Sequence, residues 1–92
     1  MSGITVQFAV YGALAGGDEN QARGVNVTSI VKSLIASQDG IVNINNTSMN
    51  GDPSLGDQKH FGATVTRDGG TYYFACAEGQ TIDFHHGGSP AQ

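Results

Sequence analysis

The chain opens with an alternating hydrophobic pattern. Ile4, Val6, Phe8 and Val10 are separated by Thr5, Gln7 and Ala9. Alternation with a period of two is typical of a half-buried β-strand, whose buried face these apolar residues would form. A glycine-rich polar stretch from Gly12 to Asn20 then predicts a long loop.

The period lengthens between residues 27 and 37. Apolar residues recur there at helical spacing, at Val27, Ile30, Val31, Leu34 and Ile35. This stripe predicts one amphipathic helix near 27–37, with Asn26 or Thr28 as its cap and Gly40 as its stop. Because the stripe is rich in β-branched residues, we expect the helix to be stabilised mainly by packing on a sheet.

The rest of the pattern predicts further strands. Residues 41–45, 61–65, 72–76 and 81–84 alternate, and Asp68-Gly69 between two of these runs favours a tight hairpin. One helix and several closely joined strands predict an α+β fold, an antiparallel sheet of about five to six strands crossed by the helix. We assign residues 1–84 to a single domain and 85–92 to a loosely ordered C-terminal tail.

Composition narrows the classes of partner. The 92 residues carry a net charge of −4, and the strong cations are four scattered residues, Arg23, Lys32, Lys59 and Arg67. Four scattered cations cannot form a basic patch, so neither nucleic acid nor an anionic membrane surface is an expected partner. We find no apolar run long enough for membrane insertion and no signal peptide before the first strand. A cytoplasmic protein is expected, with release without a signal peptide as an alternative.

Candidate catalytic groups are few. Cys76 could be a nucleophile with a histidine base, but it alternates with Phe74 on a predicted strand and is expected to be a small buried hydrophobe. Asp83, His85 and His86 could serve a metal-dependent enzyme, and Asp52 with Asp57 could hold calcium. The spacing of Asp52 and Asp57 matches no standard calcium loop, and the other three lie in or beside the predicted tail with no visible second shell. We therefore predict a protein that is not an enzyme and needs no cofactor or metal.

Side-chain donors and acceptors concentrate around the polar segment 46–58. They are Asn43, Asn45, Asn46, Asn50, Asp52, Asp57, Gln58, Lys59 and His60. Amides, carboxylates and a lysine match the directional hydroxyls of a sugar, and Tyr11, Tyr72 or Tyr73 could supply a platform for its C–H face. The alternative is a solvated loop, because Asn, Asp, Gly and Pro are also common turn formers.

Several longer runs resemble a known family. They are Ala9 to Leu14, Val25 to Ile30, Asn45 to Pro53, Lys59 to Gly62 and Tyr73 to Phe84. Together they are similar to small mushroom lectins typified by the fruiting-body lectin of Lyophyllum decastes, over nearly the whole chain. The resemblance implies a non-catalytic fungal lectin that binds terminal α-galactosyl glycans and forms a homodimer, in which paired sites crosslink glycans.

The residue chemistry then gives a ligand-binding set for the galactose-terminated glycan. It consists of Tyr11, Asn46, Asp52, Lys59, His60 and Tyr72. We expect Asp52 and Asn46 to bind sugar hydroxyls, Lys59 and His60 to donate to hydroxyls or the ring oxygen, and a tyrosine to pack on the sugar. A small protein-interaction or inhibitor domain that uses its hairpin turns is the alternative function.

Overall fold

The computed structural model describes residues 3–90 and has the predicted α+β architecture. Its elements in chain order are β1 (Thr5–Leu14), the 3-10 turn η1 (Ala15–Gly17), β2 (Ala22–Asn26), α1 (Thr28–Ser37), β3 (Ile41–Asn43), β4 (His60–Arg67), β5 (Gly70–Ala77), β6 (Thr81–Asp83) and β7 (Ser89–Pro90). Five strands form an antiparallel sheet in the order β2-β1-β4-β5-β7, while β3 and β6 pair as a separate small sheet.

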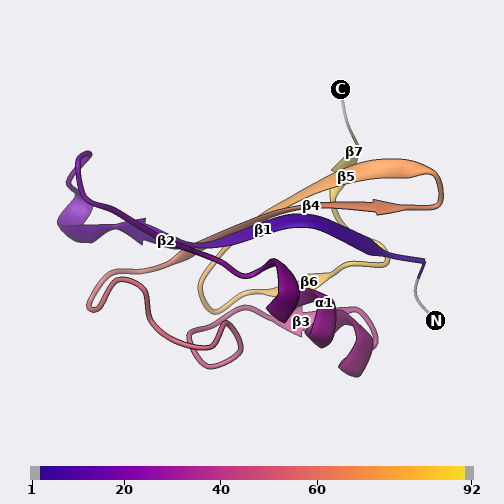
Figure 1. The fold of residues 1–92 in the computed structure, drawn as a ribbon, viewed down its shortest axis with the longest axis horizontal. Coiled ribbons are helices and arrows are strands. Elements are labelled where there is room, and N and C mark those ends of the chain that lie inside the picture. Colours follow the sequence, from indigo (N-terminus) through magenta and orange to yellow (C-terminus); the bar gives the residue numbers. More distant parts are fainter. Residues whose placement is uncertain (1–2, 91–92) are drawn as a thin grey trace.

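The molecule has two layers (Figure 1). The large sheet is one layer, and α1, the small sheet and the long segment before β4 cover one of its faces. The hydrophobic core lies between the layers and draws side chains from both. Its members include Val6, Ala9 and Tyr11 from β1, Val31 and Ile35 from α1, Val42 and Ile44 from the β3 region, Phe61, Val65 and Phe74 from β4 and β5, and Ile82 and Phe84.

The amphipathic helix that the apolar spacing predicts is present as α1. It spans Thr28–Ser37 and buries Val31 and Ile35 against the sheet. Asn26 Oδ1 accepts hydrogen bonds from the amide of Thr28 at 3.0 Å and from its hydroxyl at 2.6 Å, which satisfies an otherwise free donor in the first turn. The helix therefore lies where the apolar stripe predicts, but its N-cap is Val27, which lies between the two predicted caps. At the other end Asp39 is the first left-handed residue after the C-cap Gln38, and Gly40 follows it.

The predicted face of the first strand is wrong beyond Val6. A bulge between Val6 and Phe8 adds one residue to β1, so that Ala9 and Tyr11 point into the core. Phe8 and Val10 consequently lie on the outer face, where Phe8 is 49% exposed. One extra residue reverses the facing of every later side chain, because strand periodicity is two.

The predicted loop from Gly12 to Asn20 is also wrong in part. β1 continues to Leu14, the chain turns through η1, and β2 returns antiparallel to β1 as an edge strand. All five residues of β2 are exposed, so they carry no alternating hydrophobic signal. Pairing of backbone groups with β1 forms this strand, and a hydrophobic pattern does not reveal such pairing.

The hairpin of β4 and β5 is confirmed. Arg67 pairs with Gly70, and Asp68 and Gly69 both have positive φ, 50° and 78°, as a two-residue turn of this type requires. The predicted strands at 41–45 and 81–84 exist as β3 and β6, but they pair with each other outside the large sheet. Within the predicted tail, His85 and His86 complete a turn that begins at Phe84, and Ser89–Pro90 pairs with β5; residues 91 and 92 lie outside the described residues.

Candidate functional site

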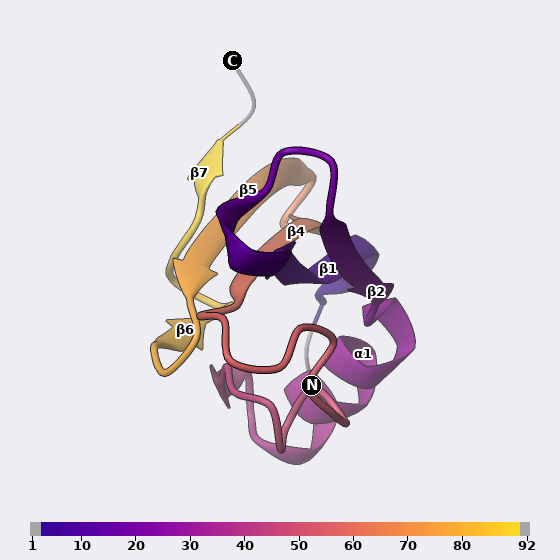
Figure 2. The ribbon, with the colours of Figure 1, turned by 90° about the vertical axis from the view of Figure 1, so that its left-hand side faces the viewer.

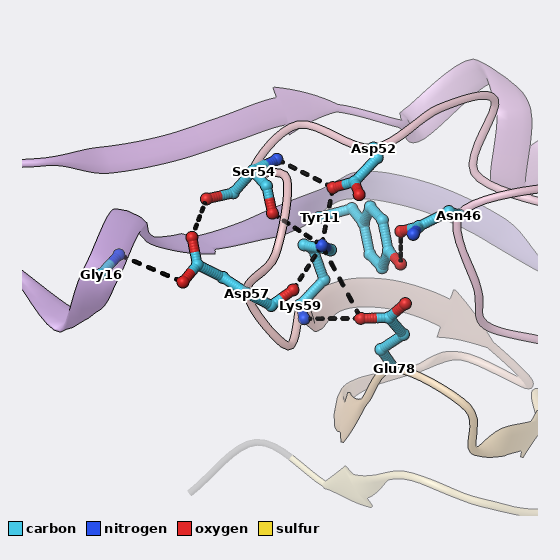
Figure 3. Close-up of polar contacts among 8 residues, drawn as sticks. All are labelled: Tyr11, Gly16, Asn46, Asp52, Ser54, Asp57, Lys59 and Glu78. Atoms are coloured by element: carbon cyan, nitrogen blue, oxygen red, sulfur yellow. Dashed lines mark hydrogen bonds and ion pairs between the residues drawn. The ribbon is translucent and has the colours of Figure 1, made fainter.

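Lys59 is the centre of the polar region that precedes β4. Its side chain is almost completely buried, and the residue as a whole is only 1% exposed. A buried ammonium is costly unless anions or hydrogen-bond acceptors surround it. The segment from Asn45 to Gln58 supplies these acceptors by folding back around the lysine (Figure 3).

The ammonium of Lys59 contacts oxygens from four residues. Nζ lies 2.6 Å from Asp52 Oδ1 and 3.9 Å from Glu78 Oε1. It also donates to the carbonyl of Ser54 at 2.8 Å and to the carbonyl of Asp57. Asp52 and the loop carbonyls are oxygen ligands of the kind that calcium prefers, although the sequence predicts no metal site, and in the structure they surround the lysine's own positive charge.

Further hydrogen bonds fix the loop around this ion pair. Ser54 Oγ donates to Asp57 Oδ2 at 2.6 Å, and the amide of Gly16 donates to Asp57 Oδ1 at 3.1 Å. These two donors hold the pKa of the Asp57 carboxyl below its usual value. The amide of Lys59 donates to Glu78 Oε1 at 2.8 Å, which ties the loop to the end of β5. A long polar loop is thereby held in one conformation.

Tyr11 lies beneath this loop and is completely buried. Its hydroxyl donates to Asn46 Oδ1 at 2.6 Å. Burial, with the nearby carboxylates of Glu78 and Asp52, raises the pKa of Tyr11 to about 12. The phenol is therefore a neutral, fixed donor near neutral pH, and its ring is part of the core instead of a surface for a ligand.

Three side chains at this site keep a polar atom free. Each of them uses only one side-chain oxygen in the contacts above: Asp52 uses Oδ1, Glu78 uses Oε1 and Asn46 uses Oδ1. Within residues 3–90, Asp52 Oδ2, Glu78 Oε2 and Asn46 Nδ2 make no hydrogen bond. The side chains of Asp52 and Glu78 are 21% and 26% exposed. We call these three residues the polar rim.

The rim carries negative charge. The hydrogen bond from Lys59 holds the pKa of Asp52 below its usual value, so this carboxylate is ionised at neutral pH. Two carboxylate oxygens and one amide nitrogen offer acceptors and a donor at fixed positions. Such a set can bind hydroxyl groups, which donate and accept in defined directions.

The structure thus brings together four of the six predicted ligand residues: Tyr11, Asn46, Asp52 and Lys59. His60 is exposed beside them in sequence, but it lies on the outer face of the sheet, at a shallow apolar depression that Val10 and Leu14 also border. Tyr72 is opposite Val65, five residues along β4 from His60, which is roughly 17 Å for a strand.

The other candidate groups are also placed. Arg67 stacks on the ring of Tyr72 at 4.0 Å and donates to the carbonyl of Phe84 at 2.6 Å, so this cation is part of the internal packing. Asp83 Oδ2 lies 3.0 Å from His86 Nδ1. The described residues hold no cluster of three or more metal-ligating side chains. Cys76 is partly buried against the core, and burial raises the pKa of its thiol.

Sequence reasoning missed Glu78, although the signal was present. The Asp68-Gly69 turn sets the register of β4 on β5, and counting back along both strands places Lys59 opposite Glu78. A lysine and a glutamate directly opposite each other on paired strands form a favourable cross-strand pair. Ser54 gave no such signal, because its role depends on how the loop folds.

We compared the chain with protein-family models, curated proteins and solved structures, and none of them matches it. Between residues 3 and 90, no helix has the length and apolar character that crossing a membrane requires.

Proposed function

We propose that this protein is a non-catalytic lectin that binds terminal α-galactosyl glycans at the polar rim. The likeness to small mushroom lectins supports the choice of galactose. The observation that carries the site is the set of free polar atoms on Asp52, Glu78 and Asn46, which Lys59 and Tyr11 hold in place from below. Two sugar hydroxyls would donate to the free carboxylate oxygens of Asp52 and Glu78, and Asn46 Nδ2 would donate to a third sugar oxygen.

This proposal changes the roles of the predicted residues. Lys59 and Tyr11 become positioning residues, because both are buried and their polar atoms are already bound. Pre-formed geometry favours sugar binding, since a rigid site does not have to order its side chains when the ligand arrives. Glu78 joins the site, whereas His60 and Tyr72 lie away from it.

The sugar site is testable with isosteric variants. Asn46→Asp keeps the oxygen that accepts from Tyr11 and removes the free amide nitrogen; Glu78→Gln keeps an oxygen for the Lys59 amide and removes the free acceptor. Each should weaken retention on a galactose column and binding on a glycan array by roughly tenfold, the cost of about one hydrogen bond. We avoid Asp52→Ala, because it would also remove a partner of Lys59.

Asn45→Asp is the matched control. Asn45 is the adjacent amide, and its Oδ1 likewise accepts an internal hydrogen bond, from the amide of Ser48 at 2.8 Å. It lies outside the rim, so its binding should equal that of the parent protein. Loss of binding in the control, or full binding in both rim variants, would remove the rim from the site.

We also propose that the outer face of the sheet is the homodimer interface. α1 and the long loop cover the other face, while Phe8, Val10 and Leu14 of β1 remain 49%, 38% and 44% exposed. Neighbouring exposed apolar side chains favour a protein contact. The same observation favours the second candidate function, a protein-interaction domain, which would use this face and not the turn at residues 67–70.

Sedimentation of Phe8→Lys separates these functions. If the face joins two copies, this variant should be monomeric, should still bind galactose and should lose glycan crosslinking. Leu55→Lys is the control, because Leu55 is 86% exposed but lies in the loop before β4. A parent protein that is monomeric and binds no galactoside would favour the protein-interaction domain.

A further inference from the structure

A cleft lies between β5 and β6, separate from the polar rim. Its volume is about 720 Å³, and it is bordered by Tyr73, Ala75, Gln80, Thr81 and Ser89, among others. This volume is within the range of sites that bind small organic ligands. The turn at residues 77–80, which carries Glu78 of the rim, forms one end of the cleft.

The cleft exists because two consecutive strands belong to different sheets. β5 is in the large sheet and β6 pairs with β3 in the small sheet, so the strands diverge from their common turn (Figure 2). The turn itself is fastened twice. The amide of Gln80 donates to the carbonyl of Ala77 at 3.2 Å, and Gln80 Oε1 accepts from the amide of Ala77 at 2.8 Å.

The far end is closed by the chain after β6. The amide of Gly87 donates to the carbonyl of Asp83 at 2.8 Å. Gly88 then lies so close to the ring of Phe74 that a Cβ there would come within 2.7 Å of it, and its φ of 91° also favours glycine. The fold alone therefore holds the cleft open, and both of its ends are fixed.

The β5 wall presents free backbone groups. The amide of Glu78 donates to the carbonyl of Lys59, so at this position the backbone groups of both strands point towards each other, as in a hydrogen-bonded pair. Such pairs recur at every second residue of an antiparallel ladder, so the N–H and C=O of Ala75 point away from β4. On that side β5 pairs with β7 only at Tyr72 and Tyr73, and among the described residues no turn or loop group bonds to the N–H or C=O of Ala75.

The β6 wall is built in the same way. The amide of Ile44 donates to the carbonyl of Gln80, and the amide of Phe84 donates to the carbonyl of Gly40. The intervening alternation turns the N–H and C=O of Thr81 away from β3, towards the cleft. Within residues 3–90, β6 pairs only with β3, and no turn or loop group bonds to the N–H or C=O of Thr81.

The groups that the cleft offers at Ala75 and Thr81 are uncharged, and the one carboxylate among its lining residues makes its contacts elsewhere. The carboxylate of Asp83 is engaged by its own turn: Oδ1 accepts from the amides of His85 and His86, and Oδ2 lies against the ring of His86. The ring of Tyr73, 48% exposed, stands at the border, and Ser89 adds a hydroxyl. Neutral donors and acceptors beside an aromatic ring match a neutral polyhydroxylated ring, whose hydroxyls bind backbone groups and whose C–H face packs on the aromatic.

We propose that the cleft is a second binding site, which takes a neutral hexose through the backbone groups of Ala75 and Thr81. The proposal rests on the proposed function for the class of ligand and goes beyond it in number of sites. One chain would then hold two sugars on either side of the turn at residues 77–80. A monomer could crosslink glycans, and a dimer would bind them with higher avidity.

Amide-resolved NMR titration with methyl α-galactoside tests this directly on the parent protein. We expect two groups of shifting amides, one at Ala75, Thr81 and Asp83, the other at Asn46, Asp52 and Glu78. Calorimetry should give roughly two sugars per chain, as expected for independent sites.

Two variants at one position sharpen the test. Ala75→Pro removes the N–H that faces the cleft, and that N–H takes no part in the ladder with β4. It should remove the shifts at Thr81 and Asp83, leave those at Asn46 and Glu78, and reduce the stoichiometry by half. Ala75→Gly is the matched control, because it loosens the strand yet keeps the N–H, and it should retain both groups of shifts.

The outcomes separate the two proposals. Shifts confined to Asn46, Asp52 and Glu78 would overturn the cleft and support the rim. Shifts confined to the cleft would support the second site and overturn the placement of the first. If no amide shifts at saturating galactoside, both sites are overturned.

Discussion

The loop that surrounds Lys59, from Asn45 to Gln58, and the cleft between β5 and β6 lie on either side of the turn at residues 77–80. The polar groups of the loop are mostly bonded internally, whereas those that the cleft offers are free within residues 3–90. In the loop, buried Lys59 gathers carboxylates and carbonyls until its charge is compensated. In the cleft, the backbone groups of Ala75 and Thr81 point outward without a partner in the described residues. The loop uses most of its polar groups in internal hydrogen bonds that fix its conformation, whereas the cleft is held in shape by the pairing of strands in two sheets.

This difference shows where binding groups come from in a small fold. A loop without regular structure needs internal bonds to hold a shape, so few of its polar atoms remain for a ligand. Strand edges are already fixed by pairing on one side, and their other side is free. A loop rich in Asn and Asp is therefore a weaker sign of a binding site than its composition suggests.

The largest expected effect comes from removing the charge at the centre of the loop. Lys59→Met should destabilise the protein by roughly 3–5 kcal/mol, because it leaves buried acceptors without their cation. Urea unfolding, monitored by circular dichroism, would measure the change in the free energy of unfolding. Lys32→Met is the control: Lys32 is exposed on α1, and its substitution should stay within about 0.5 kcal/mol. A small effect at Lys59 would mean that the loop does not depend on the ion pair.

A pair of proline variants tests the opposite arrangement in β5. The N–H of Cys76 belongs to the ladder with Phe61, whereas that of Ala75 faces the cleft. Cys76→Pro should therefore cost more stability than Ala75→Pro, by about 1 kcal/mol or more for the lost hydrogen bond. The same unfolding measurement applies. Equal costs would contradict the assignment of alternate residues to the two sides of β5.

A smaller effect is expected at Tyr11. Tyr11→Phe keeps the ring and removes the hydrogen bond to Asn46, at a cost of about 1 kcal/mol. The pKa of Tyr11 is raised in the folded state to about 12, from about 10 in a free tyrosine. The phenol's contribution is therefore complete below about pH 10 and is lost as the pH rises through about 12.

Unfolding curves at several alkaline pH values would show this dependence in the parent protein. Tyr11→Phe should flatten it, since the titrating group is gone. An unchanged slope in the variant would assign the alkaline transition to another group.

Much of the framework follows from local sequence. The apolar spacing from Val27 to Ile35 specifies a helix wherever it can be packed, because helical spacing gathers those residues on one face. Asp68-Gly69 fixes a two-residue turn, and that turn sets the whole register of β4 on β5, including Lys59 opposite Glu78. These features depend on contacts between residues that are close in sequence or aligned by one turn.

Tertiary structure decided the rest, because it depends on pairings between distant segments. A single bulge after Val6 turns Tyr11 inward and Phe8 outward. Tyr11, which could have been a surface for a sugar ring, is therefore buried and supports the site from below. Lys59 became an internal charge only when residues 52–57 folded over it. The cleft has no local signature at all, since it arises where β5 and β6 join different sheets. The sequence by itself determined the helix, the central hairpin and the supply of polar groups, whereas long-range packing decided which of those groups remained free.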